Sequence, residues 1–328
     1  MKGINVGFGN RGKAWHRWAK AAGVDVVGVV DLNREILDRN CDELEIPEPM
    51  RFTSIEEAVA STDAEVATVC TANPHHNAAI QSGLDAGLHV IVEKPMVETA
   101  EDANEIIKKA EGKGLQVACS QDYRFNPGVL TLRNAIENGE IGELVSASVT
   151  FHRWRPTEGL FLPLMLNQSI HHLDGLRWIL QDDPAWCFAR SFNPDWNKCD
   201  GPTVIEAIYG FSKGTMVTYS GSYVAQGTVT PYSGLWRIEG STGQMHFQGD
   251  GDEAVTLTRR DPKESRTLPA IKTELASPAQ VCRDFLDAIR NGTPAPTAAQ
   301  DNVKSLAMAW AAQKSSDENR VVQIDEAI

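Results

Sequence analysis

The stretch Ile4-Asn5-Val6-Gly7-Phe8-Gly9-Asn10-Arg11-Gly12, close to the start of the chain, decides the fold. Apolar residues run directly into a G-x-G-x-x-G pattern, and residues 11–22 then show helical spacing. The glycine pattern alone is weak, but a strand before it and a helix after it are the context in which such a turn binds phosphate. Gly7 permits the tight turn, Gly9 lets a pyrophosphate approach the backbone, and Gly12 lets the helix pack against the strand.

The start of the following helix and the end of the next strand supply polar groups to the same site. Asn10 and Arg11 stand at the expected helix N-terminus, where unpaired N–H groups and the helix dipole favour phosphate, and Arg11 adds its own charge. Asp31 ends the second strand, 19 residues after Gly12. A carboxylate there accepts hydrogen bonds from a ribose 2′-hydroxyl and repels a 2′-phosphate, which favours NAD over NADP. Arg34 is near enough in sequence to pair with a phosphate, so NADP stays an alternative, and a helix N-cap is the structural alternative for Asp31.

Apolar runs alternate with helical segments through the first 120 residues. The runs that we interpret as strands are residues 4–7, 24–30, 64–70, 88–92 and 115–120. The helical segments are 11–22, 33–44, a helix capped by Ser54, 75–86, and 99–112 with a Thr99–Asp102 capping pattern. This alternation predicts a parallel sheet of about six strands covered on both faces, and right-handed crossovers make it a doubly wound Rossmann domain.

The pattern changes from about residue 121. The strand-like runs are 144–151, 185–192, 203–211, 214–224, 235–240, 243–248 and 254–259, and the helical segments are 127–138, 168–180, 278–291 and 298–315. Short turns such as Ser212-Lys213-Gly214 and Ser241-Thr242-Gly243 favour antiparallel hairpins. We therefore predict an α/β protein with a dinucleotide-binding Rossmann domain (1–120) and a substrate-binding and oligomerisation α+β domain (121–328). The second domain is expected to contain a large open, mostly antiparallel sheet, with the C-terminal helix free to pack back on the first domain.

Charge and composition narrow the class of partner. The formal net charge is −13, and no basic block is present of the kind that binds nucleic acid or anionic lipid. No long uncharged apolar run is present that would predict a membrane helix. We therefore expect a small-molecule partner, and neither nucleic acid nor a membrane.

The six cysteines are scattered at positions 41, 70, 119, 187, 199 and 282, and none forms a C-x-x-C pair. This spacing does not predict a disulfide framework, which favours a reducing compartment and a cytoplasmic protein. We expect no metal site either. Adjacent histidines, as at 75–76 and 171–172, diverge on a strand or helix, and no carboxylate or cysteine set accompanies them in sequence.

Several further motifs follow in a fixed order. They are Cys70-Thr71-Ala72-Asn73-Pro74-His75-His76, Ala86-Gly87-Leu88-His89-Val90-Ile91-Val92-Glu93-Lys94-Pro95, Tyr123-Arg124-Phe125-Asn126-Pro127, Gly139-Glu140-Ile141-Gly142, Asn167-Gln168-Ser169-Ile170-His171-His172-Leu173-Asp174 and Ile238-Glu239-Gly240-Ser241-Thr242-Gly243. With these motifs the chain resembles the glucose–fructose oxidoreductase/inositol dehydrogenase/MocA family over nearly its whole length. The resemblance implies a nicotinamide-dependent oxidoreductase that acts on a sugar, cyclitol or related polyol.

Glu93-Lys94-Pro95 follows the fifth strand, and ligands of open α/β sheets bind outside the carboxyl ends of strands. The resemblance implies that Lys94 contacts both the cofactor and the reacting oxygen of the substrate, that Glu93 helps to seat the cofactor, and that a cis bond precedes Pro95. A lysine ammonium in this place would stabilise developing alkoxide charge. A surface lysine after a strand is the structural alternative.

The resemblance implies that the run from Asn167 to Asp174 is the catalytic helix of the second domain. Asn167 and His171 are four residues apart, so they would share one face of that helix. His171 would move the hydroxyl proton, because an imidazole titrates near neutrality. The family usually has an aspartate where Asn167 stands, and an asparagine cannot supply negative charge to the histidine. Asp174 either contacts substrate, supports His171 or forms a salt bridge with Arg177.

The remaining candidates surround these groups. The resemblance implies cofactor contacts from Asn73 and His76. Candidate substrate contacts, each with packing or loop anchoring as the alternative, are Tyr123, Arg124, Arg153 and Trp154. We interpret Trp236, with Tyr219 and Tyr223 on adjacent strands, as sheet surface, and the resemblance implies a homodimer or homotetramer through that sheet.

Two other functions stay open at this point. One is a catalytically silent regulator on the same fold, although Lys94 and His171 are both retained. The other is glycoside hydrolysis through a transient oxidation by tightly held NAD.

Overall fold

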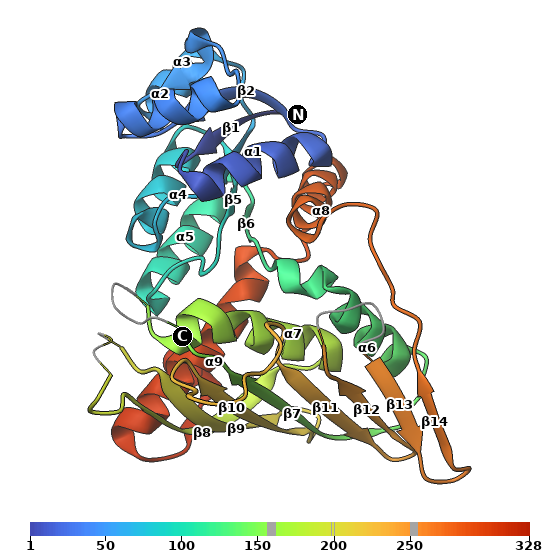
Figure 1. Ribbon diagram of the computed structural model, residues 1–328. Helices are drawn as coiled ribbons and strands as arrows, with labels where there is room; N and C mark the ends of the chain where they lie inside the picture. The colour runs from blue at the N-terminus through green and yellow to red at the C-terminus, as the bar shows by residue number, and fades with distance from the viewer. Residues whose placement is uncertain (156–161, 198, 200, 250–254) are drawn as a thin grey trace. The chain divides into compact units, whose positions relative to one another are not determined.

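The computed structural model describes residues 1–155, 162–197, 199, 201–249 and 255–328. Its contacts divide the chain into two compact units (Figure 1). The first unit contains Met1–Asp122 and Glu274–Val303, and the second contains Tyr123–Thr273 and Lys304–Ile328. The sequence pattern placed residues 274–303 in the second domain, so the observed division differs there. The roles assigned to the two domains stay predictions.

The first unit is built on a parallel six-stranded sheet in the order β3-β2-β1-β4-β5-β6. Its strands are β1 (Lys2–Val6), β2 (Asp25–Val30), β3 (Arg51–Phe52), β4 (Val66–Val69), β5 (His89–Val92) and β6 (Val117–Cys119). The order reverses between β1 and β4, which is the switch point where doubly wound sheets bind their ligands. The predicted Rossmann fold is confirmed. The two-residue strand β3 was not among the expected runs, because two residues are too short to show a period.

Six α-helices of the described residues belong to this unit. They are α1 (Asn10–Ala22), α2 (Arg34–Glu43), α3 (Ile55–Ser61), α4 (His76–Asp85), α5 (Ala100–Lys113) and α8 (Ser277–Asn291), with short 3₁₀ turns η1 (Glu48–Met50) and η2 (Asn73–His75). The expected caps are present: the Ser54 hydroxyl accepts from Glu57 N–H, and the Thr99 hydroxyl accepts from Asp102 N–H. Helix α8 packs beside α1 (Figure 1).

The second unit contains a nine-stranded sheet in the order β14-β13-β12-β11-β7-β10-β9-β8-β15. Its strands are β7 (Leu144–His152), β8 (Pro184–Phe192), β9 (Val204–Phe211), β10 (Met216–Ser222), β11 (Leu235–Gly240), β12 (Gln244–Phe247), β13 (Val255–Arg259), β14 (Glu264–Thr267) and β15 (Val322–Gln323). Only the β7–β10 pair is parallel among the described pairings, so the predicted mostly antiparallel sheet is confirmed. Strands β14 and β15 were not predicted, and residue 254, the start of one expected run, lies outside the described residues.

Helices α6 (Pro127–Glu137) and α7 (Ile170–Leu180) lie along one face of this sheet (Figure 1). The 3₁₀ turn η3 (Asp122–Phe125) precedes α6, the π-helical turn η4 (Met165–Ser169) precedes α7, and the chain ends with α9 (Ala299–Glu318) and the 3₁₀ turn η5 (Ile324–Ala327). The Tyr209 hydroxyl on β9 donates to the Met308 carbonyl of α9, and this hydrogen bond ties α9 to the nine-stranded sheet. All six cysteines are free thiols. Among the helices of the described residues, none combines the length and apolarity required of a membrane span.

Candidate functional site

The turn after β1 has the backbone that a phosphate-binding loop needs. Gly7 has a φ of +83°, in the left-handed region, and a Cβ there would lie 2.6 Å from the Thr71 nitrogen. A Cβ on Gly12 would collide with the Gly7 carbonyl oxygen, so α1 packs against the turn only because that residue is glycine. A Cβ on Gly9 would meet no described atom within 4 Å. The tight turn and the close helix therefore need two of the glycines, and the space beside Gly9 fits a bound phosphate.

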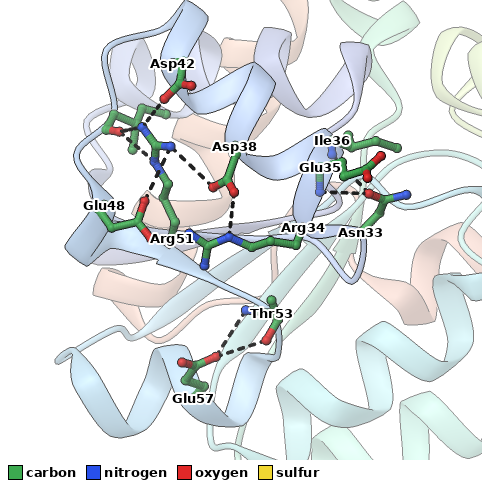
Figure 2. Close-up of polar contacts among 11 residues, drawn as sticks. Asn33, Arg34, Glu35, Ile36, Asp38, Asp42, Glu48, Arg51, Thr53 and Glu57 are labelled. Carbon is green, nitrogen blue, oxygen red and sulfur yellow. Dashed lines mark hydrogen bonds and ion pairs between the residues drawn. The ribbon is translucent and has the colours of Figure 1, made fainter.

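Asp31 leaves the end of β2 and binds the turn. Its carboxylate accepts hydrogen bonds from Phe8 N–H at 2.7 Å and from Asn33 N–H at 2.9 Å. The side chain that caps α2 is that of Asn33, which accepts from the N–H groups of Glu35 and Ile36 (Figure 2). Each carboxylate oxygen of Asp31 has a further lone pair that could accept from a ribose hydroxyl.

A cavity of about 520 Å³ opens beside this turn, within the first unit. Its walls come from the ends of the central strands and the starts of the helices that follow them: Val6, Gly7, Gly9, Val30, Asp31, Leu32, Asn33, Ile36, Ser54, Ile55, Glu56, Cys70, Thr71, Ala72, His75, Ala78, Ala79 and Ser82. Mostly apolar walls that also carry the carboxylates of Asp31 and Glu56 suit an adenosine, whose base is flat and whose ribose carries hydroxyls. The residues present therefore fit the nucleotide half of NAD.

The cavity also differs in detail from the predicted contacts. Thr71, Ala72 and His75 line it, whereas the expected residues Asn73 and His76 are not among its lining. The imidazole of His76 is buried, and its ring nitrogens lie 2.7 Å from the Pro95 carbonyl and 3.1 Å from the Thr71 carbonyl. Burial lowers the pKa of His76. This histidine joins the loop after β4 to the loop after β5, and a direct cofactor contact from it stays a prediction.

Glu93 is enclosed at the end of β5 and binds two side chains of α1. Its Oε1 lies 2.6 Å from Arg11 Nε and 2.6 Å from Trp15 Nε1, and its other carboxylate oxygen accepts from Lys94 N–H at 3.3 Å. The carboxylate thus fixes α1 to the strand end that carries Lys94. The cis peptide bond expected between Lys94 and Pro95 is confirmed.

Asp122 adds a second carboxylate beside this cluster. Its Oδ1 atom is enclosed. Burial, together with the Glu93 carboxylate, raises the pKa of Asp122 to about 6, against the opposing influence of Arg11 and Lys94. Sequence reasoning missed this residue because nothing in the run Ser120-Gln121-Asp122 distinguishes it from a polar loop. A titrating carboxyl beside Lys94 marks this end of the sheet as a candidate functional site.

In the second unit, His171 lies in the first turn of α7 and is mostly buried. The ring of Tyr123 stacks on its imidazole, with the centroids 4.4 Å apart and the planes at 20°. Asn167 lies one turn earlier, in the π-helical turn η4. Hydrogen bonds of a π-helix run from i to i+5, so the regular α-helical spacing that we used to put Asn167 and His171 on one face does not hold across this turn.

Asp174 and Arg124 form a buried ion pair, with Arg124 Nε 2.7 Å and Nη2 2.8 Å from the two carboxylate oxygens. Ser305 donates to the same carboxylate at 2.8 Å. Arg177, the partner that helical spacing offered for Asp174, pairs with Asp183 at 2.8 Å and donates to the Ser305 hydroxyl, which in turn donates to Asp174, so a direct salt bridge between Asp174 and Arg177 stays a prediction. Arg124 immediately follows Tyr123, so the ion pair anchors the segment whose ring stacks on His171.

The interpretation of three aromatic residues as sheet surface is wrong. Tyr219, Tyr223 and Trp236 are each at most 2% exposed. Tyr219 lies on β10, Tyr223 directly follows that strand and Trp236 lies on β11, and β10 and β11 are not adjacent because β7 lies between them. The Tyr219 hydroxyl donates to Ser169 at 2.7 Å and lies 3.0 Å from the buried His172 ring. The Tyr219 and Trp236 rings contact His172 of α7, whereas the Tyr223 ring contacts Phe151. Hydrophobicity alone does not tell which face of a strand is covered.

The predicted substrate residues Arg153 and Trp154 follow β7. Arg153 donates to the Thr230 carbonyl at 2.8 Å and its guanidinium lies 6.0 Å from the centre of the Tyr232 ring. Trp154 is 55% exposed, so its indole has a free face for a ligand. Among the residues that the structure describes, no group of three or more His, Cys, Asp or Glu side chains could hold a metal ion.

Comparisons with known proteins agree with this arrangement. Residues 3–121 match an oxidoreductase family with an NAD-binding Rossmann fold, and residues 129–246 match the GFO/IDH/MocA C-terminal domain. The chain is 27% identical to 1,5-anhydro-D-fructose reductase of Ensifer adhaerens over 83% of this chain and 84% of that protein. It is 26% identical to inositol 2-dehydrogenase of Pseudomonas savastanoi over 92% of this chain and 89% of that one.

A solved structure shares the fold of the whole chain. It is an oxidoreductase from Agrobacterium radiobacter in complex with NAD⁺, L-tartaric acid and magnesium, with a TM-score of 0.89, 20% identity, and coverage of 100% of this chain and 99% of that one. The resemblance read from the motifs is thus confirmed by both domains in their expected order. The chain belongs to the Gfo/Idh/MocA family and is an NAD(P)-dependent oxidoreductase with an NAD-binding Rossmann domain.

Proposed function

We propose that the protein transfers a hydride between a nicotinamide cofactor and a hydroxyl or keto carbon of a sugar, cyclitol or related polyol. The observation that carries this proposal is the cluster at the end of β5, where Glu93 ties Lys94 to α1 and thus to the glycine turn. The relatives named above, a reductase of an anhydro sugar and an inositol dehydrogenase, support the substrate class.

The cofactor would be held by the turn and the strand ends around it. We assign the phosphates to the backbone at Gly7, Gly9, Asn10, Arg11 and Gly12, the adenosine ribose to Asp31, and contacts nearer the nicotinamide to Asn73, His76, Glu93 and Lys94. Bound there, NAD would supply the hydride acceptor for oxidation of the substrate carbon, and NADH the hydride donor for reduction. NAD is the expected cofactor, and NADP is the alternative.

Lys94 and His171 are assigned different roles at the reacting oxygen of the substrate. The Lys94 ammonium donates a hydrogen bond to that oxygen and stabilises negative charge as the C–H bond breaks. The His171 imidazole accepts the hydroxyl proton during oxidation and returns it during reduction. Asn167 orients the substrate or the imidazole through its amide but adds no charge. Tyr123 limits the motion of His171 by stacking on it.

The substrate is proposed to contact polar side chains and the face of one aromatic ring. Arg124 and Asp174 neutralise one another, so we assign them to holding Tyr123 and α7 in place, and direct contact with the substrate is the alternative. Arg153 and Trp154 suit a hydroxylated ring that has an apolar side. A cytoplasmic location and a homodimer or homotetramer through the sheet remain part of the proposal.

Lys94→Met tests the assignment. Loss of one donor aimed at a developing oxyanion costs about 10²–10³ in kcat, so turnover should fall by that factor while the Kd for NAD stays within about twofold. Lys109→Met is the matched control, because Lys109 pairs with Asp85 on the helical layer and should leave turnover unchanged. Equal activity in the Lys94 variant would remove this lysine from the mechanism.

A substrate screen separates the three candidate functions. Purified protein with NAD or NADP is offered polyols, aldoses and sugar acids, and absorbance at the NADH band is followed. Free NADH released in turnover supports the dehydrogenase, glycoside cleavage without net NADH supports the hydrolase, and cofactor binding with no chemistry supports the regulator.

A further inference from the structure

A network of two arginines and three carboxylates runs along α2 and joins this helix to η1 and β3 (Figure 2). Arg34 is the first residue of α2, three positions after Asp31. Its Nε lies 2.8 Å from Asp38, one turn along the helix, and its Nη2 pairs with Glu48 in η1. The guanidinium is therefore committed to two carboxylates on the side of the helix away from Asn33.

The neighbouring Arg51 strengthens this arrangement. It shares both carboxylates with Arg34, at 3.4 Å to Asp38 and 3.6 Å to Glu48, and it has a carboxylate of its own in Asp42 at 2.7 Å. Three carboxylates thus face two guanidinium groups, and the network has a net negative charge. The Arg34 guanidinium, through its hydrogen bond, lowers the pKa of Asp38, so this carboxylate is ionised at neutral pH.

The placement matters because of what NADP would need at this position. A 2′-phosphate carries up to two negative charges and is bound by a cation at the end of the second strand, where this chain has the carboxylate of Asp31. Arg34 is the basic residue closest in sequence to Asp31. Its Nε and Nη2 are already engaged, and the carboxylates that engage them would repel a phosphate that approached.

We propose that Asp38 and Glu48 are cofactor-selectivity residues, which withhold Arg34 from the 2′-phosphate of NADP and so reinforce the repulsion from Asp31. This inference rests on the proposed function, because it takes the adenosine ribose to lie at Asp31. It predicts that selectivity for NAD has two separable components: a repulsive carboxylate at the ribose, and a cation held out of reach by two residues that contact no cofactor.

The network can be altered without damage to the fold. Asp38, Glu48 and Arg34 have side chains between 37% and 65% exposed, and exposed ion pairs of this kind contribute little to stability. Arg51 keeps its hydrogen bonds to the Ile46 carbonyl and its ion pair with Asp42 when the other two carboxylates are neutralised. The variants can therefore be compared as folded proteins.

The experiment measures Kd for NAD⁺ and NADP⁺ by titration calorimetry at low ionic strength, because salt screens exposed charges. The starting protein is Asp31→Asn, which removes the direct repulsion. Adding Asp38→Asn and Glu48→Gln should tighten NADP⁺ binding by a further factor of about five to ten, the equivalent of one to two exposed ion pairs, and change the Kd for NAD⁺ less than twofold.

Asp42→Asn in the Asp31→Asn background is the matched control. It removes a charge from the same network at a carboxylate that pairs with Arg51, so it should change NADP⁺ affinity less than twofold. When Arg34→Gln is added to the Asp31→Asn/Asp38→Asn/Glu48→Gln protein, the increase in NADP⁺ affinity should disappear. The melting temperature of each variant checks its fold.

The outcomes separate the inference from the site on which it rests. The inference fails, while the ribose site stands, in either of two outcomes. In the first, neutralising Asp38 and Glu48 increases NADP⁺ affinity no more than the Asp42 control does. In the second, the increase in NADP⁺ affinity persists when Arg34 is also replaced. If Asp31→Asn itself changes neither affinity, the placement of the ribose at Asp31 fails, and the inference fails with it.

Discussion

Replacing Arg124 by alanine should destabilise the second unit much more than the loss of an arginine from its surface. The guanidinium contacts both oxygens of Asp174, at 2.7 and 2.8 Å, and the side chains are 6% and 0% exposed. Truncation would leave the Asp174 carboxylate buried without its bidentate partner, while Ser305 still donates to it. Removing one member of a buried pair costs about 3–5 kcal/mol.

This cost translates into a measurable shift in the melting temperature. One kcal/mol lowers the Tm of a unit of this size by about 2–4 °C, so Arg124→Ala should lower it by roughly 6–20 °C. Differential scanning calorimetry would measure the shift. Arg124→Met combined with Asp174→Leu should recover much of the loss, because an apolar pair of similar volume carries no desolvation penalty.

Arg237→Ala is the comparison, since Arg237 lies on the same sheet with an exposed side chain paired to Glu239. An exposed pair contributes about 0–1 kcal/mol, so this variant should melt within roughly 4 °C of the parent. If Arg124→Ala melts no lower than Arg237→Ala, the buried pair does not hold the second unit together in the way we have argued.

Three further predictions concern other parts of the chain. Gly9→Ala should keep the parental Tm, because the new Cβ meets no described atom within 4 Å. The same Cβ would occupy the space that we assign to phosphate, so dinucleotide binding measured by calorimetry should weaken by about tenfold or more. Unchanged affinity would place the phosphates elsewhere. Trp236→Ala should cost about 3–5 kcal/mol in urea unfolding, since a 2%-exposed indole leaves a cavity, whereas a surface residue would cost almost nothing. The pKa of Asp122 is raised to about 6, so the stability that its protonated form contributes is fully present below about pH 4 and is lost between pH 4 and 6. The free energy of unfolding of Asp122→Asn should therefore match that of the parent at pH 4 and exceed it by about 1–3 kcal/mol at pH 7. Parallel curves of stability against pH for the two proteins would contradict this.

The fold of the first unit could be predicted because its local signals agree with one another. The apolar run into Gly7, the caps at Ser54 and Thr99, and the alternation of strands with helices all indicate a Rossmann sheet, and each is a short-range property of the chain. What could not be predicted depends on long-range pairing. Strand β3 has only two residues, and residues 274–303 join the first unit through contacts that no local pattern records.

The candidate site divides in the same way. The glycine turn, Asp31 and the Glu93-Lys94-Pro95 tripeptide carry chemistry in their sequence, so they could be named in advance. The pairing of Asp174 with Arg124 could not, because Arg124 lies fifty residues earlier in the chain, and helical spacing indicates only partners such as Arg177, three residues away. Burial also reversed the interpretation of Trp236, since a strand of alternating residues does not reveal which face is covered.

The π-helical turn before α7 has a consequence for how this chain is aligned with its relatives. One extra residue in the turn displaces everything on its N-terminal side by about a third of a rotation relative to a straight helix, while His171 and Asp174 keep their places. Counting back four positions from the histidine would then equate Asn167 with the wrong neighbour in any relative whose helix is regular there. A one-residue shift within Met165–Ser169 would bring Leu166 or Gln168 to that place, and neither side chain is acidic, so this turn supplies no carboxylate before the histidine in either alignment.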